Sequence, residues 1–325
     1  MREKRTRLMI VVSTLLVVYY CGEPGRPASG KGVSSLKEVG CLDFGPAYDV
    51  VVVYKTAYVT GNRGVHIIDV ENPVSPRELG RLKLQDGAFG ISVRGHRAYI
   101  AGDSEGFFIA DIADPKNPVV IGQYSPKEGL TEDVSIDGTL AYVIKREGRL
   151  LVLDITNESK PLLLGELPVG SAGKEAVHQE DRLYLADSSW GLVLLDVSDP
   201  SSPLRVSVVP GTEGASGIAF KTSWIFLACH RFGLKILDVS AAARPQVKGT
   251  FRFSSEANAV LVDNDDLYVA DQNDGTIHVL DVKDPLLPAI VTSRKGYMPH
   301  RLFHDGDYLY AADGKHGLVI FQYVR

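Results

Sequence analysis

The chain has 325 residues, of which 45% are hydrophobic and 23% are charged, and its formal net charge is −5. This composition is typical of a globular protein with enough apolar side chains for a large core. The mild negative charge, with no Lys/Arg cluster beyond the first seven residues, argues against a nucleic-acid partner.

The first 20 residues have the pattern of a secretory signal. Four basic residues within Met1–Arg7 precede a 13-residue apolar run at Leu8–Tyr20. A helix needs about 20 residues to cross a bilayer, so the run is short for a transmembrane anchor, which is the alternative. We therefore predict a signal peptide over residues 1–20.

Cys21 follows the apolar run directly, and this position resembles the cleavage site of bacterial lipoproteins, where the cysteine receives a lipid. Tyr19 and Tyr20 depart from that pattern, because small residues are usual there. Residues 21–35 are rich in Gly, Pro and Ser and are predicted to form a flexible tether. We expect an exported, lipid-anchored protein of the bacterial cell envelope, at the outer membrane or the cell surface.

Two cysteines remain after Cys21, and they fall in different parts of the chain. Two cysteines cannot form the dense disulfide framework of small secreted domains. Cys41 and Cys229 are therefore predicted to be free, mostly buried thiols.

A segment of one form recurs seven times. It has an aromatic and a small residue, an apolar run, a short polar loop and a second aliphatic run, and it ends in Asp in six copies and in Gln in the last. Its final positions are spaced 41 to 43 residues apart. These positions are Asp69, Asp111, Asp154, Asp196, Asp238, Asp281 and Gln322. A repeat of this period and regularity identifies a modular fold.

Each repeat is predicted to form four short strands. The two middle runs, such as AYIA at 98–101 and LVLLD at 192–196, are apolar almost throughout, whereas ELGRLKL at 78–84 alternates. This gradient suits a unit whose inner strands are covered on both faces. Units of four strands and about 40 residues arranged radially make a β-propeller. The predicted fold is therefore an all-β, seven-bladed β-propeller over residues 36–325.

The ends of the chain predict how the ring closes. The seventh repeat ends at its third strand, whereas Leu36–Phe44 matches the fourth strand of the other repeats. This N-terminal strand is predicted to complete the last blade, which removes two open sheet edges.

The segments GLVLLDVSDPSSP (191–203), GVHIIDVENPVSP (64–76) and GLKILDVS (233–240) resemble the LVIVD repeat family. The resemblance covers about residues 36–325. It implies a bacterial or archaeal propeller of the kind often found on exported or cell-surface proteins, and it implies no single activity.

Three sets of residues are interpreted as structural: repeat aspartates, loop glycines and four histidines. The six repeat aspartates each precede a turn whose backbone their carboxylates can bind. The glycines of the loops between the second and third strands are predicted to adopt positive φ. His178 and His304 occupy positions that are apolar in the other repeats, so we expect them to pack between blades; His66 and His278, in third strands, are interpreted in the same way.

Function is expected where the repeats differ, in the loops and strand starts around one mouth of the central channel. Trp190, His230, Arg231 and Phe232 fall in loops of adjacent blades, and exposed aromatics beside an Arg dominate many binding sites. The alternative is that the aromatics cover the seam between blades. His316 lies in the matching loop of the last blade.

Charged residues gather at the starts of the first strands. Asp49, Glu132, Asp133 and Glu175 are expected to face His300 and Arg301 around the mouth. Converging carboxylates can hold Ca²⁺, but a rim of ion pairs is the favoured interpretation, so we predict no metal and no cofactor.

Three hypotheses for function follow. The first is a monomeric binding or interaction scaffold for a protein, a peptide or a glycan. The second is a hydrolase or lyase at the channel mouth, which His230, His300, His316, Arg301 and Glu175 could serve, although no catalytic motif stands out. The third is a structural subunit of the cell surface, for which self-association would be the evidence.

Overall fold

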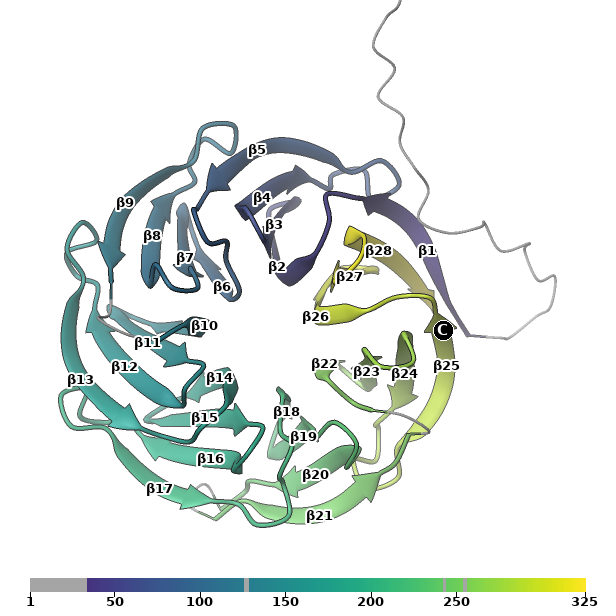
Figure 1. Cartoon of the computed structure of the whole chain (residues 1–325). Coiled ribbons are helices and arrows are strands. Elements are labelled where there is room, and N and C mark those ends of the chain that lie inside the picture. The colour runs from purple at the N-terminus through teal and green to yellow at the C-terminus, as the bar shows by residue number, and fades with distance from the viewer. Residues whose placement is uncertain (1–33, 126–128, 242–243, 254–255) are drawn as a thin grey trace, which may run out of the picture.

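The computed structural model describes residues 34–125, 129–241, 244–253 and 256–325. It contains seven four-stranded antiparallel sheets arranged as blades in a ring (Figure 1). The described residues contain no helix that could span a membrane. The predicted all-β, seven-bladed propeller is confirmed. The predicted signal peptide (1–20) and nearly all of the predicted tether (21–35), including Cys21, lie outside the described residues.

The first four blades follow one another along the chain, each with its strands in sequence order from the centre outward. Blade 1 consists of β2 (Ala47–Val53), β3 (Thr56–Gly61), β4 (Gly64–Asp69) and β5 (Arg77–Lys83). Blade 2 consists of β6 (Ile91–Arg94), β7 (Arg97–Ala101), β8 (Phe107–Asp111) and β9 (Val119–Tyr124). Blade 3 consists of β10 (Thr131–Asp137), β11 (Leu140–Lys145), β12 (Arg149–Asp154) and β13 (Leu162–Pro168). Blade 4 consists of β14 (Gly173–Gln179), β15 (Arg182–Asp187), β16 (Gly191–Asp196) and β17 (Leu204–Val208).

The remaining three blades complete the circle. Blade 5 consists of β18 (Gly217–Lys221), β19 (Trp224–Ala228), β20 (Leu234–Asp238) and β21 (Gln246–Phe251). Blade 6 consists of β22 (Ala259–Asp263), β23 (Asp266–Asp271), β24 (Thr276–Asp281) and β25 (Ala289–Lys295). Blade 7 consists of β26 (Pro299–Asp305), β27 (Tyr308–Asp313), β28 (Gly317–Val324) and, on its outside, β1 (Ser35–Leu42).

The hydrophobic core is divided into seven clusters, each between two neighbouring blades. In one of them, Val65 and Ile67 of blade 1 pack against Ile91 and Ile100 of blade 2. The middle strands are buried on both faces because a sheet lies on either side, as in β16, where only Asp196 is partly exposed. The outermost strand β17 is mostly exposed, so the predicted gradient of burial is confirmed.

The N-terminal strand closes the ring. β1 pairs antiparallel with β28, from Ser35 beside Val324 to Leu42 beside Leu318. The predicted closing segment, Leu36–Phe44, contains nearly all of this strand. Because the start and the end of the described chain lie in the same blade, the last sheet has four strands like the others.

The six repeat aspartates have the structural role that the sequence predicts. Each carboxylate accepts a hydrogen bond from the backbone N–H two residues further on, at 2.8 to 3.0 Å. These bonds hold the turns between the third and fourth strands. The glycines of the loops between the second and third strands also have positive φ, for example 106° at Gly64.

The four histidines interpreted as structural are packed against aromatic rings. His178 stacks on Tyr142 of the preceding blade with ring centroids 5.0 Å apart, and His304 stacks on Tyr268 at 5.7 Å. His66 stacks on Phe44 at 3.8 Å, and His278 stacks on Phe253 at 4.9 Å. Burial lowers the pKa of His66 to about 4, so this imidazole is neutral at pH 7.

The two cysteines after Cys21 differ. Cys229 is a free, fully buried thiol, as predicted, and burial raises its pKa to about 12. Cys41 is buried but disulfide-bonded, so the prediction of a free thiol is wrong there. The prediction of a free Cys41 rested on Cys41 and Cys229 falling in different repeats, and this argument weighed no other disulfide for Cys41.

Glycines in the outer strands let neighbouring blades approach closely, a role that the sequence reasoning missed. A Cβ atom on Gly122 of β9 would lie 1.8 Å from the Glu158 carbonyl oxygen in the next blade. Gly40 and Gly80 meet the corresponding turns at 2.0 and 2.4 Å. Gly249 of β21 differs, because its nearest neighbour would be the flexible Cδ1 of Ile236 at 3.3 Å.

We predict that Gly122→Ala lowers the free energy of unfolding by about 1–3 kcal/mol, because the backbone carbonyl of Glu158 cannot yield without moving the blade. Gly249→Ala is the matched control and should change it by about 0.5 kcal/mol or less. Urea unfolding followed by circular dichroism measures both. Equal losses would mean that the contact between blades does not require the glycine.

Candidate functional site

A cavity of about 420 Å³ opens at one mouth of the central channel. Every blade contributes to its lining the residue at the equivalent position near the start of its innermost strand. These residues are Tyr48, Phe89, Glu132, Lys174, Ser216, Asn258 and His300. Arg146, His230 and Gln272 reach the same cavity from loops between second and third strands. We call this cavity the mouth pocket.

The loops that form the mouth lie on one face because they are hydrogen-bonded to each other. The Ala88 N–H, before blade 2, donates to the Gly61 carbonyl at the loop of blade 1, at 3.0 Å. The Thr131 N–H donates to the Asp103 carbonyl at 2.9 Å in the next pair of blades. The variable positions of neighbouring repeats are thereby brought together.

One side of the mouth pocket is an aromatic wall. The rings of Tyr48 and Phe89 stack with centroids 4.7 Å apart, and His300 contacts Tyr48 edge-on at 5.4 Å. The Arg146 guanidinium lies 4.6 Å from the centre of the Phe89 ring. The hydroxyl of Tyr48 donates to Asn62 Oδ1. Residues from blades 7, 1, 2 and 3 therefore form one continuous cluster of rings and a guanidinium along this side of the pocket.

Glu132 joins this wall to the polar side of the pocket. Its carboxylate binds Arg146 Nε at 2.6 Å and Lys174 Nζ at 3.1 Å. The Glu132 side chain is only 14% exposed, so the two cations hold it in one position within the pocket.

The opposite side carries two histidines oriented by amides. The Gln272 N–H donates to Asn258 Oδ1 at 2.8 Å, so Asn258 Nδ2 is the donor to His230 Nδ1, also at 2.8 Å. Gln272 Nε2 donates to the Pro299 carbonyl at 3.2 Å and to His300 Nδ1 at 2.8 Å. Both imidazoles therefore carry their proton on Nε2 when neutral. Burial lowers the pKa of His230 and of His300, which favours the neutral form.

Arg301 forms the floor of the mouth pocket. Its guanidinium reaches across the channel, forms an ion pair with Glu175 and lies 3.8 Å from Asp133 Oδ1. A second cavity of about 310 Å³ lies beyond it and is also lined by Arg301, Asp49, Asp133 and Glu175. Arg301 thus separates the two cavities.

The three carboxylates around Arg301 also connect adjacent blades. Asp49 accepts a hydrogen bond from the Ile91 N–H at 2.9 Å, and Asp133 accepts one from the Ala176 N–H at 2.9 Å. Glu175 accepts one from the Ile218 N–H at 3.1 Å. They therefore lie within the channel rather than on an exposed rim.

Burial dominates the electrostatics of this cluster. It raises the pKa of Asp49 to about 6 and that of Asp133 to about 7, although Arg301 opposes both shifts. Burial lowers the pKa of Arg301, but the neighbouring carboxylates outweigh it and raise that pKa overall. The cation among these carboxylates is thus the guanidinium. Within the described ranges, no three metal-ligating side chains are grouped to hold a metal ion.

The structure separates the candidate residues of the loops. His230 lines the mouth pocket, whereas Trp190, Arg231 and Phe232 do not. Trp190 is 38% exposed with Arg205 4.6 Å from its ring centre, and Phe232 is 37% exposed beneath Arg231 at 5.0 Å. His316 is also outside the pocket, with Nδ1 3.0 Å from Asp313 Oδ1.

Three buried carboxylates that the sequence reasoning overlooked shape the loops near the mouth. Asp187, Asp271 and Asp313 end the second strands of blades 4, 6 and 7 and are fully buried. Each accepts hydrogen bonds from two N–H groups of the following loop, at 2.8 to 3.1 Å. The recurring Ala-Asp pair at these positions was the available signal.

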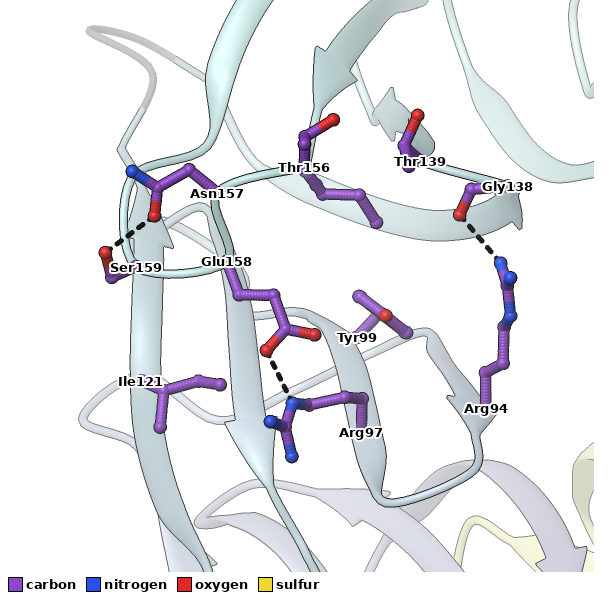
Figure 2. Close-up of a pocket in the computed structure, with 11 residues that line it drawn as sticks. Arg94, Arg97, Tyr99, Ile121, Gly138, Thr139, Thr156, Asn157, Glu158 and Ser159 are labelled. Atoms are coloured by element: carbon purple, nitrogen blue, oxygen red, sulfur yellow. Dashed lines mark hydrogen bonds and ion pairs between the residues drawn. The ribbon is translucent and has the colours of Figure 1, made fainter.

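A hollow of about 760 Å³ lies elsewhere, at the seam between blades 2 and 3 on the opposite face (Figure 2). Arg94 donates to the Gly138 carbonyl at 2.7 Å, and Arg97 binds Glu158 at 2.7 Å and Asp111 at 3.1 Å. Both arginines are thus bound by groups of the protein, and these contacts hold the two blades together.

Comparisons with known proteins agree with this architecture. The family model described as the LVIVD repeat matches residues 44–83, 87–125, 128–167, 175–209, 214–252 and 303–321. A crystal structure of the computationally designed protein Ika8 is similar, with a TM-score of 0.64 and 12% sequence identity. The similarity covers 86% of this chain and 83% of that one, and it concerns the fold alone. No curated protein matches.

We predict that Asp133→Asn becomes more stable relative to the wild type as the pH rises from 5 to 8. The folded pKa of about 7 is above the ordinary value of 3.8, so only the folded wild type takes up this proton between these values. The wild type therefore loses stability as the pH rises through 7, whereas the amide does not. The difference in the free energy of unfolding should change by about 1.4 kcal/mol or more.

Urea unfolding at several pH values measures this difference. Asp307→Asn, in the exposed turn between β26 and β27, is the control for the loss of a carboxylate that is not buried. Parallel profiles for the two variants would contradict the assigned pKa shift.

Proposed function

Because the chain belongs to the LVIVD repeat family, whose repeats here build a seven-bladed β-propeller, we propose that it is an interaction module holding its ligand in the mouth pocket. The observation that carries this proposal is that all seven blades contribute one variable side chain to the same 420 Å³ cavity. Concave sites with an apolar wall and a few oriented polar groups are typical of ligand binding. The ligand is a protein, peptide or glycan segment that inserts into the mouth.

The proposal includes export and a lipid anchor on Cys21 in a bacterial envelope. The direction of β1 indicates on which face of the propeller the predicted tether would be attached. Leu42 lies beside Leu318, close to the mouth-side loop, whereas Ser35 lies beside Val324 at the other end of the blade. The predicted tether therefore joins the propeller on the face opposite the mouth pocket.

We predict that Cys21→Ser releases the protein from the membrane fraction into the soluble fraction. A lipid attached to the cysteine by a thioether survives reduction, so mass analysis of the reduced N-terminal peptide should show an added lipid only in the wild type. A wild-type peptide without lipid would refute the anchor. A Cys21 that carries a lipid thioether cannot also form a disulfide, so recovery of a wild-type peptide that joins Cys21 to Cys41 before reduction would equally refute the anchor.

We predict that mouth variants lose partner capture. The combined variant Phe89→Ala, Lys174→Ala and His230→Ala removes wall and polar groups of the pocket and should lower crosslinked capture from envelope extracts at least about tenfold. Trp190→Ala with Phe232→Ala is the matched control and should retain capture, because both residues lie outside the pocket.

The reverse result would move the site to the exposed aromatics of blades 4 and 5. Equal capture by both variants would place the partner elsewhere on the propeller. Near-ultraviolet circular dichroism of each variant checks that the tertiary structure is intact.

A further inference from the structure

We propose that the mouth pocket accepts the uncharged terminal saccharide unit of a glycan. This inference rests on the proposed function and names the ligand class of the same site. Three properties of the pocket lead to it: its closed end, its aromatic wall, and the orientation of its polar groups.

The pocket is closed at its inner end. Arg301 lines both this cavity and the one beyond it, and its guanidinium is fixed by Glu175 and Asp133. A polymer cannot thread through the channel past this ion pair. The ligand must therefore enter by its end, and 420 Å³ is within the usual range of small-ligand sites, about 300–1,000 Å³.

The aromatic wall offers apolar surface on one side of the pocket only. The Phe89 ring lies between the Tyr48 ring and the Arg146 guanidinium, so it presents its edge to the pocket and supports Tyr48. The C–H groups of a sugar ring are weakly apolar, so they can pack against this wall. The same ring carries hydroxyl groups at its edge, which then point to the other side of the pocket.

The other side presents hydrogen-bonding groups of both kinds. Since Nδ1 of His230 accepts from Asn258, its Nε2–H is a donor. Both hydrogen atoms of Gln272 Nε2 are used, which leaves Oε1 as an acceptor. Glu132 is a further acceptor. Adjacent sugar hydroxyls donate and accept at once, so they match this alternation.

The polar groups also argue against an apolar peptide side chain. Inserting one would remove water from Glu132, Lys174 and Arg301 without replacing its hydrogen bonds, which is costly. The three cations of the lining are already paired, since Arg146 and Lys174 bind Glu132 and Arg301 binds Glu175. The pocket therefore suits an uncharged saccharide.

The test is binding of the purified propeller to an array of neutral and uronate-bearing oligosaccharides, with peptides of matched length as a separate arm. We expect wild type to bind neutral saccharides at least as strongly as uronate-bearing ones. Phe89→Ala and Gln272→Ala should each weaken that binding at least about tenfold, whereas Trp190→Ala should leave it unchanged. Isothermal titration with the best saccharide gives the dissociation constants.

Binding of peptides but of no saccharide would overturn this inference, as would saccharide binding that Phe89→Ala and Gln272→Ala leave intact. If no saccharide binds but the combined mouth variant still loses its captured partner, the ligand class is wrong and the proposed function stands. If that variant also keeps its partner, the proposed function fails as well.

Discussion

The pairing of β1 with β28 is the joint on which the ring depends, because blade 7 alone is assembled from both ends of the described chain. Figure 1 shows β1 lying outside the last three strands of the chain. Without β1, the edge of β28 would be unpaired and open to other strands. The cluster between blades 6 and 7 would also lose Leu36 and Cys41.

Ring closure determines the geometry of the channel as well. Arg301 belongs to blade 7, and its partners Asp133 and Glu175 belong to blades 3 and 4, on the far side of the channel. This contact exists only while the circumference is fixed. The glycines of the outer strands, such as Gly122, help to fix it by letting each blade approach the next. The close approach of neighbouring blades at these glycines thus contributes to the distance that Arg301 spans across the channel.

The sequence predicted the propeller scaffold well because the scaffold consists of repeated blades. The spacing of the repeat aspartates predicts the number of blades. The turns that follow these aspartates depend on hydrogen bonds between residues close in the sequence, so the local sequence is enough to predict them. His178 and His304 were placed between blades because other repeats have apolar residues there. The close contact at Gly122 could not be predicted from the sequence, because its partner Glu158 belongs to the next repeat and their distance depends on how two blades pack.

The candidate site was predictable only in outline. The variable strand starts and loops were the right regions, but periodicity does not say which of two adjacent side chains faces the channel. His230 lines the pocket while its neighbours Arg231 and Phe232 lie outside it. Asp133 was expected on a charged rim, yet it is buried and its pKa is raised, a result that depends on the blades around it.

The floor of the pocket shows how stability and binding are divided among residues. Burial disfavours the charge of Arg301, so the guanidinium persists only because carboxylates surround it, and these carboxylates are held by N–H groups of neighbouring blades. Removing Arg301 would leave buried carboxylates without their cation and would disturb both ring and pocket. The side chains of Phe89 and His230 take no part in this ion-pair network. Substituting them would therefore change the walls of the pocket while leaving its floor in place.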